Sequence, residues 1–286
     1  MSEHLWTGPD GADPLAFLAT LGAFRVLALS QSNLRLSWRP EGPRWRPCLH
    51  GELGQAQILA LLAAHMKDRA KADEFNQILG AEVRVEPSLF RDWLKWSVGR
   101  PQEEWAAAYG ARVGEKITAT PFHMMGGPQK FLAELRRLAT AVDPEPDFTE
   151  ALYGPWTYTH DQSSYGWDPT QGVTYAYLAR KPEVLPYRSV RGALWLLVEA
   201  IPFFPTFSAR RLQTTAFVRR RDGEEERSYF QWPIWTEPLS LDVIRCILGA
   251  DLSNNEARRA PDVAAVYKSE RVQDGYYARF RPASRM

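Results

Sequence analysis

The sequence Asp13-Pro-Leu-Ala-Phe-Leu-Ala-Thr-Leu-Gly-Ala-Phe-Arg-Val-Leu-Ala-Leu29 is the strongest structural signal in the chain. Asp13 is a favourable N-cap residue, and Pro14 suits the first helical position, where a backbone N–H would have no partner. The apolar side chains that follow surround the helix axis instead of forming one narrow stripe. We therefore predict a helix over residues 14–29 that is buried on most of its sides.

Outside this segment, the first half of the chain has mainly helical patterns. Leu34, Leu36 and Trp38 alternate with polar residues, which predicts a strand, and residues 44–50 follow as its hairpin partner. Further helices are predicted, from apolar spacing, over residues 55–79, 88–96, 101–109 and 128–142.

The segment Asp143-Pro-Glu-Pro-Asp147 separates a part of the chain with mainly helical patterns from a part with mainly strand patterns. We interpret it as a linker or boundary. Beyond it, two helices are predicted over residues 190–201 and 241–248, the second capped by Ser240. Strands are predicted over residues 173–179, 213–219, 228–234, 263–268 and 276–280.

These patterns predict an α+β fold with a helix-rich N-terminal half and a strand-rich, mainly antiparallel C-terminal half. We divide the chain into a helix-rich region, 1–143, and a mixed strand and helix region, 148–286, and leave open that the two form one integrated domain. The motif Trp232-Pro-Ile-Trp235 is predicted to end an edge strand, because Pro233 cannot donate to a ladder. We expect its tryptophans to pack on the helix over residues 190–201.

Composition excludes several classes of protein. With 35 Lys and Arg against 34 Asp and Glu in 286 residues, the chain cannot coat nucleic acid through bulk positive charge. Two cysteines, Cys48 and Cys246, exclude a disulfide-rich scaffold and a four-cysteine zinc site. No apolar stretch reaches the ~18 residues of a membrane span, and no basic stretch precedes an apolar run at the start. We therefore expect a soluble, cytoplasmic chain with no membrane partner.

The sequence contains none of the common catalytic motifs for acyl, phosphoryl or metal-dependent chemistry. His160, Asp161 and Asp168 are residue types that bind divalent metals, so a metal-dependent nuclease is one alternative. A complete ligand set is not visible, however, and Asp168-Pro169 is also a common way to open a turn. The sequence therefore favours a non-catalytic protein with no cofactor and no metal.

Positive charge is concentrated between Arg180 and Arg221, a segment that contains nine basic and only two acidic residues. Aromatic residues are interleaved with them, a composition that suits binding of phosphates and stacking on bases. We interpret Arg219-Arg220-Arg221 as facing Glu224-Glu225-Glu226 across a hairpin turn. The candidate residues for binding nucleic acid or an acidic partner are Arg188, Arg191, Arg210, Arg211, Arg279 and Arg281.

Several short motifs are distributed along nearly the whole chain. They are residues 13–25 with Leu36-Ser-Trp38, Pro121-Phe122, Trp167-Asp168-Pro169, Arg191-Gly192-Ala193, Thr214-Thr215 and residues 232–235. In this order they resemble the accessory proteins of type I-G (formerly I-U) CRISPR systems, most of all the extension family encoded beside the helicase–nuclease.

The resemblance implies a non-catalytic protein of antiviral defence, since this family offers no catalytic motif to carry over. It implies binding to CRISPR effector complex subunits, to the helicase–nuclease, or to DNA or RNA. A third alternative is a protein-only scaffold, because tryptophan and arginine are enriched at the hot spots of protein interfaces.

Overall fold

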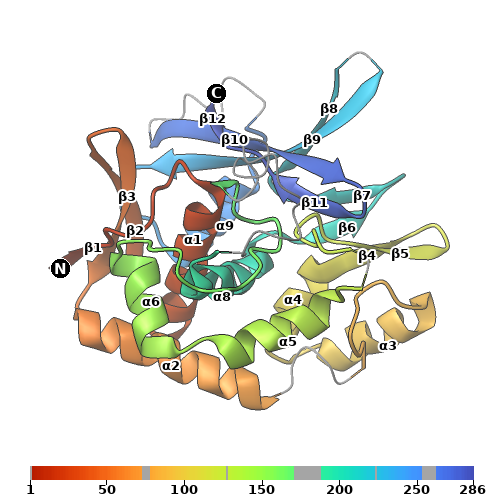
Figure 1. Ribbon diagram of the computed structural model, residues 1–286, viewed down its shortest axis with the longest axis horizontal. Helices are drawn as coiled ribbons and strands as arrows, with labels where there is room; N and C mark the ends of the chain where they lie inside the picture. Colours follow the sequence, from red (N-terminus) through yellow and green to blue (C-terminus); the bar gives the residue numbers. More distant parts are fainter. Residues whose placement is uncertain (1, 73–77, 127, 171–187, 223, 253–261) are drawn as a thin grey trace.

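The structure is a computed structural model, and it describes residues 2–72, 78–126, 128–170, 188–222, 224–252 and 262–286. The helix α1 (Pro14–Ser30) lies at its centre (Figure 1) and is buried continuously from Pro14 to Ala28. As predicted, Asp13 caps this helix: its Oδ1 accepts the N–H of Ala16 at 2.9 Å. Apolar side chains on every side of α1 explain why it has no solvent-facing stripe.

One side of α1 packs against α8 (Arg191–Ala200) at unusually short range. A Cβ atom added at Gly22 would lie 1.7 Å from the carbonyl oxygen of Leu196. The two backbones can approach this closely only because residue 22 has no side chain.

The other side of α1 packs against the main sheet. Its strands follow the order β11 (Tyr277–Phe280), β10 (Val263–Asp274), β9 (Glu225–Trp235) and β8 (Phe217–Asp222), all antiparallel, and β12 (Ser284–Arg285) pairs with β10. The ring of Phe17 lies 5.7 Å from that of Trp232 and 6.4 Å from that of Phe230. Tilted aromatic contacts thus join the central helix to strand β9.

A smaller antiparallel sheet stands beside α1, in the order β1 (Ser2–Leu5), β3 (Arg44–Gly51) and β2 (Arg35–Glu41). Trp38 of β2 stacks on Phe17 with a centroid distance of 5.6 Å. The predicted hairpin of the first half is therefore confirmed, and it also contacts the central helix.

The remaining elements surround this centre (Figure 1). They are the helices α2 (Gln55–Ala72), α3 (Pro87–Ser97), α4 (Glu103–Tyr109), α5 (Phe131–Ala141), α6 (Pro144–Tyr153) and α9 (Leu241–Leu248), the 3₁₀ turn Ile201–Phe203, and the hairpins β4 (Gly110–Val113) with β5 (Lys116–Ala119) and β6 (Thr206–Ser208) with β7 (Leu212–Thr214). The helices lie mostly in the first half and the main sheet in the second, so the predicted α+β class is confirmed. The strand predicted over residues 173–179 lies outside the described residues.

Two predictions about local structure are wrong. The segment 143–147 is not a linker: it begins helix α6, because Pro144 fits the first helical turn and the acidic Glu145 and Asp147 favour a helix N-terminus. The hydrophobic core accordingly continues from one region into the other. The strand predicted over 213–219 is divided into β7 and β8 by a break at Ala216, whose φ is +63°.

The tryptophans of residues 232–235 pack differently from the prediction. Both are fully buried. Trp232 contacts the rings of Phe17, Phe230 and Tyr267, and Trp235 those of Phe17 and Trp38, so none of their ring partners among the described residues lies on α8. The strand β9 lies between β8 and β10, so it is not an edge strand. Its pairing with β8 covers only Glu225 to Phe230, however, so Pro233 pairs with Val266 of β10 alone, which explains how a proline fits there.

The close contact of α1 with α8 predicts that Gly22→Ala lowers the free energy of unfolding by about 3 kcal/mol, because a methyl group must displace the Leu196 carbonyl. The matched control is Gly54→Ala, where the nearest atom to the added Cβ is 3.7 Å away. We expect this control to stay within about 0.5 kcal/mol of the parent in urea unfolding. Equal losses in the two variants would contradict the packing described here.

Candidate anion-binding cleft

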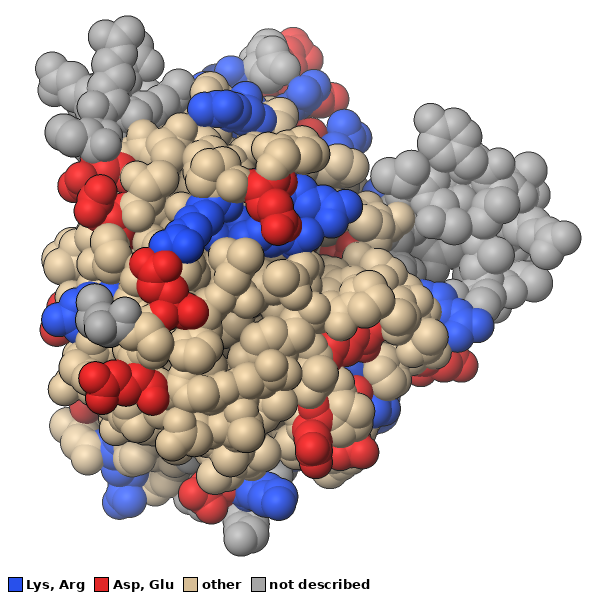
Figure 2. Space-filling view, turned by 90° about the vertical axis from the view of Figure 1, so that its left-hand side faces the viewer, with Lys and Arg blue, Asp and Glu red and all other residues tan. Residues whose placement is uncertain are grey.

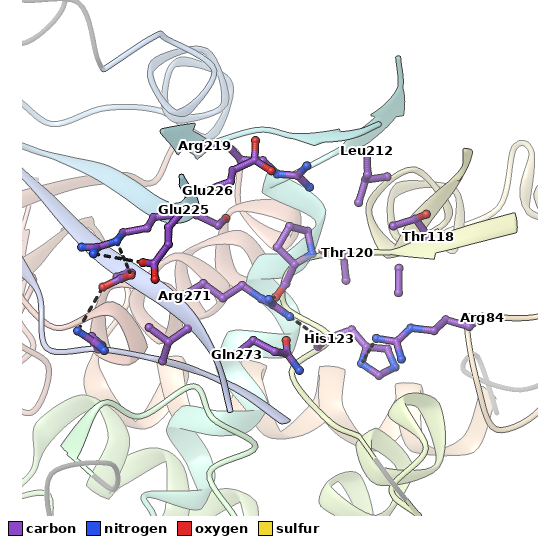
Figure 3. A pocket seen from close by; sticks show the side chains of 17 residues that line it. Arg84, Thr118, Thr120, His123, Leu212, Arg219, Glu225, Glu226, Arg271 and Gln273 are labelled. Atoms are coloured by element: carbon purple, nitrogen blue, oxygen red, sulfur yellow. Dashed lines mark hydrogen bonds and ion pairs between the residues drawn. The ribbon is translucent and has the colours of Figure 1, made fainter. Parts of the chain in front are cut away.

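A cleft of about 660 Å³ opens between the main sheet and the segment that leads from β5 to α5 (Figure 3). Both charged and neutral hydrogen-bonding side chains line it. The charged residues are Arg84, Arg219, Arg227, Arg271 and Arg281, with Glu225, Glu226 and Glu270. Since arginine predominates, the cleft is a candidate site for an anion.

The pairing of three strands brings two of these arginines together. Ser228 of β9 is the register partner of Arg219 on β8 and of Arg271 on β10. Register partners lie on the same face of a sheet, so the two arginines stand on either side of the small side chain of Ser228, about 10 Å apart at the backbone. This row leaves room above Ser228 for a group that both guanidinium groups can contact.

The guanidinium of Arg271 is fixed by the backbone of the neighbouring loop. Its Nε donates to the carbonyl oxygen of Pro121 at 2.8 Å, and its Nη2 to that of His123 at 3.3 Å. Burial, together with the positive charges of Arg84 and Arg219, lowers the pKa of Arg271 to about 10. An anion bound here would relieve this repulsion between cations.

Arg84 reaches the same cleft from the opposite wall, next to His123 (Figure 3). Its Nη2 lies 3.4 Å from Nδ1 of His123, whose Nε2 lies 2.9 Å from Oε1 of Glu82. This chain of contacts fits a histidine that donates from Nε2 to Glu82 and accepts at Nδ1 from Arg84. Burial raises the pKa of Glu82, but the hydrogen bonds from His123 and from the N–H groups of Val83 and Arg84 outweigh this effect and lower the pKa to about 2. The ionised Glu82 thus fixes the loop that presents Arg84.

The glutamates of the cleft are engaged with other arginines. Glu270 lies 3.4 Å from Arg281 and 3.9 Å from Arg227, and Glu226 pairs with Arg211. Among the described residues, Arg84, Arg219 and Arg271 have no ion pair with a carboxylate. Three unneutralised guanidinium groups therefore face one cavity.

The six arginines predicted from the sequence do not form one surface. Arg281 lines the cleft, and Arg211 forms an ion pair with Glu226, which also lines it. Arg191 pairs with Asp147 at 2.8 Å, at the start of α8, and Arg188 donates to the carbonyl oxygen of Thr159. Arg210 is exposed, and Arg279 is half-buried on β11.

The interpretation of Arg219-Arg220-Arg221 holds only for Arg221, which lies opposite Glu226 in the hairpin of β8 and β9. Arg219 lies opposite Ser228 and belongs to the cleft instead. Arg84 and the role of Arg271 were missed by sequence reasoning, because residues 84, 219 and 271 meet only through the tertiary fold.

The structure separates the histidine and aspartates that were weighed as a metal site. The Nε2 atom of His160 lies 3.2 Å from Asp147 and 3.5 Å from Glu150, whereas Asp168 accepts from the N–H and the hydroxyl of Thr170. Asp161 is exposed. The part of the chain that the structure describes contains no group of three or more His, Cys, Asp or Glu placed to hold a metal ion.

Asp168 has another neighbour, the helix cap Asp13. Burial and the nearby charge of Asp168 raise the pKa of Asp13 to about 7, against the effect of the N–H groups that it caps. Burial likewise raises the pKa of Asp168. Two acidic side chains therefore share a poorly solvated site at the start of the central helix.

The raised pKa of Asp13 predicts a specific pH dependence of stability. The folded state holds a proton on Asp13 that the unfolded state releases near pH 4. The contribution of this proton to the free energy of unfolding therefore has its full value below about pH 4 and decreases as the pH rises from about 4 to about 7. Asp13→Asn should remove this loss, because asparagine caps a helix without ionising. We expect the variant to gain stability relative to the parent between pH 5 and pH 8 in urea unfolding.

Asp13→Ala serves as the control, since it removes the charge and the cap together and should cost about 1 kcal/mol at pH 3, where Asp13 is mostly protonated in both the folded and the unfolded state. A constant difference between Asp13→Asn and the parent across this pH range would contradict the raised pKa.

Charges elsewhere on the surface are more evenly mixed. On the face shown in Figure 2, which includes the side where β1 and β3 lie in Figure 1, Lys and Arg side chains form a band against which Asp and Glu side chains lie. The small sheet contains two ion pairs, Arg39 with Glu3 and Arg46 with Glu41.

Comparison of the chain with protein-family models and with curated proteins finds no match. Across the described residues, no helix has the length and apolarity needed to cross a membrane.

Proposed function

We propose that this chain is a non-catalytic protein that binds nucleic acid through the phosphate backbone, as an accessory protein of CRISPR-based antiviral defence. The observation that carries the proposal is the cluster of Arg84, Arg219 and Arg271, which face one cleft without a carboxylate partner among the described residues. Guanidinium groups bind phosphate oxygens at two points, and a bound phosphate offsets the repulsion among them.

The geometry favours an extended phosphate chain over a single small anion. The cleft is open, and its cationic side chains come from two strands and a loop on opposite walls. Neutral donors, Thr118, Thr120 and Gln273, line the space between them (Figure 3). Phosphate contacts of this kind position a nucleic acid without reading its sequence.

The resemblance to type I-G accessory proteins supplies the biological setting. In that setting the partners would be effector complex subunits, the helicase–nuclease, or the DNA or RNA that they handle. No observation on the described residues favours the metal-dependent nuclease, so we do not propose it.

The test is binding of a fluorescent 20-nucleotide oligothymidine, measured by anisotropy over a series of salt concentrations. Three phosphate contacts predict a log–log slope of about −2 for single-stranded nucleic acid. Arg271→Gln should flatten the slope by about 0.7, and the double change Arg84→Gln with Arg219→Gln by about 1.4, and both should weaken binding. The double variant affects only exposed side chains and leaves the fold intact.

The matched control is Arg39→Gln, which removes an exposed arginine on the small sheet that is paired with Glu3. It should bind with the parental slope. Absence of oligonucleotide binding by the parent would contradict the proposal and favour a protein-only scaffold. Parental slopes in both cleft variants would show that nucleic acid binds elsewhere.

A further inference from the structure

A second, smaller pocket of about 230 Å³ lies on the other side of strands β7 and β8. The two strands contribute to both sites: Leu212 and Arg219 line the cleft, whereas the residues between them along the chain, 213–218, line the pocket. Residues 249–252, which follow α9, complete the wall.

This pocket contains polar side chains that the described residues leave unsatisfied. Gln231 is 1% exposed, and neither its Oε1 nor its Nε2 has a hydrogen-bond partner among the described residues. The same holds for Oγ1 of Thr214, which is 6% exposed. A buried amide or hydroxyl without a partner destabilises a fold, so these residues call for an explanation beyond packing.

The backbone holds Gln231 in place. Its neighbours Phe230 and Trp232 face the core, so Gln231 points to the opposite side of β9. Its N–H donates to the carbonyl oxygen of Ala216 at 2.8 Å, at the break between β7 and β8 where Ala216 has a φ of +63°. The unpaired amide therefore stands on a fixed strand, as a recognition group requires.

An aromatic side chain lies at the same pocket. Phe207 of β6 lines it and is 59% exposed, which is unusual for a phenylalanine. An exposed aromatic ring beside an amide with a free donor and a free acceptor matches the chemistry of a nucleobase. The ring can stack on the base, and a glutamine amide pairs at two points with the adjacent donor and acceptor of adenine.

We infer that this pocket receives a nucleobase, which Gln231 and Thr214 contact by hydrogen bonds and Phe207 by stacking. The inference rests on the proposed function and adds to it the part of the nucleic acid that is recognised. Because β8 forms a wall of both sites and is the outer strand of the described sheet, a nucleic acid strand that crosses this edge can reach both.

The test uses adenosine, which has no phosphate, in saturation-transfer NMR with the full chain. The parent should transfer magnetisation to the adenine protons at millimolar concentration. Gln231→Leu and Phe207→Ala should each weaken binding about tenfold. Gln231→Leu should also keep or raise the Tm, because it replaces an unsatisfied buried amide by an apolar side chain of similar size. A purely structural role for Gln231 would instead lower the Tm.

Arg271→Gln is the control that separates the two proposals, because it should bind adenosine like the parent. Adenosine binding that is lost in Gln231→Leu supports the pocket even if oligothymidine does not bind. Unchanged adenosine binding in both pocket variants, or no transfer to any of the four ribonucleosides, would overturn the inference.

Discussion

The close contact between the backbones of α1 and α8, at Gly22 and Leu196, is the constraint on which the rest of the structure depends. It places Phe17 against the aromatic face of the main sheet, where it contacts Phe230 and Trp232. Phe230 in turn contacts Phe122, at a centroid distance of 5.8 Å. The carbonyl oxygen of the preceding residue, Pro121, accepts from the guanidinium of Arg271. The cleft is therefore positioned by the core and not by a surface loop alone.

Two features of this fold oppose its stability, and both lie beside strand β8. On one face, three arginines repel one another without a carboxylate partner among the described residues. On the other, Gln231 and Thr214 bury polar atoms that make no hydrogen bond there. Natural proteins often keep such unfavourable groups where a ligand compensates for them. Their location on both faces of one outer strand is what connects the cleft with the pocket.

Local signals in the sequence were sufficient to predict much of the fold. Asp13-Pro14 marked the start of α1 and Ser240 that of α9, because capping depends on a few neighbouring residues. The same kind of signal was misread at Pro144, where proline and acidic residues begin a helix and do not form a linker. The partner of Trp232 could not be predicted, since it depends on the order in which α8, α1 and the sheet are stacked.

Most of the candidate site could not be predicted from the sequence. Arg219 and Arg271 become neighbours only through the register of three strands, and Arg84 joins them from the loop that Glu82 fixes. The segment 180–221, with its local surplus of positive charge, contains Arg219 of the cleft, but the arginines selected from it were others. Of those, Arg191 and Arg211 are neutralised by Asp147 and Glu226, which a count of nearby acids did not reveal.

The most direct test of the central claim is the NMR signal of the Arg271 Nε–H group during titration with oligothymidine. The account predicts that this signal shifts and saturates with the same Kd as the anisotropy measurement, because a phosphate replaces the repulsion of Arg84 and Arg219. The signal of Arg191, which Asp147 already neutralises, should stay in place. Binding that leaves the Arg271 signal unchanged would contradict the account.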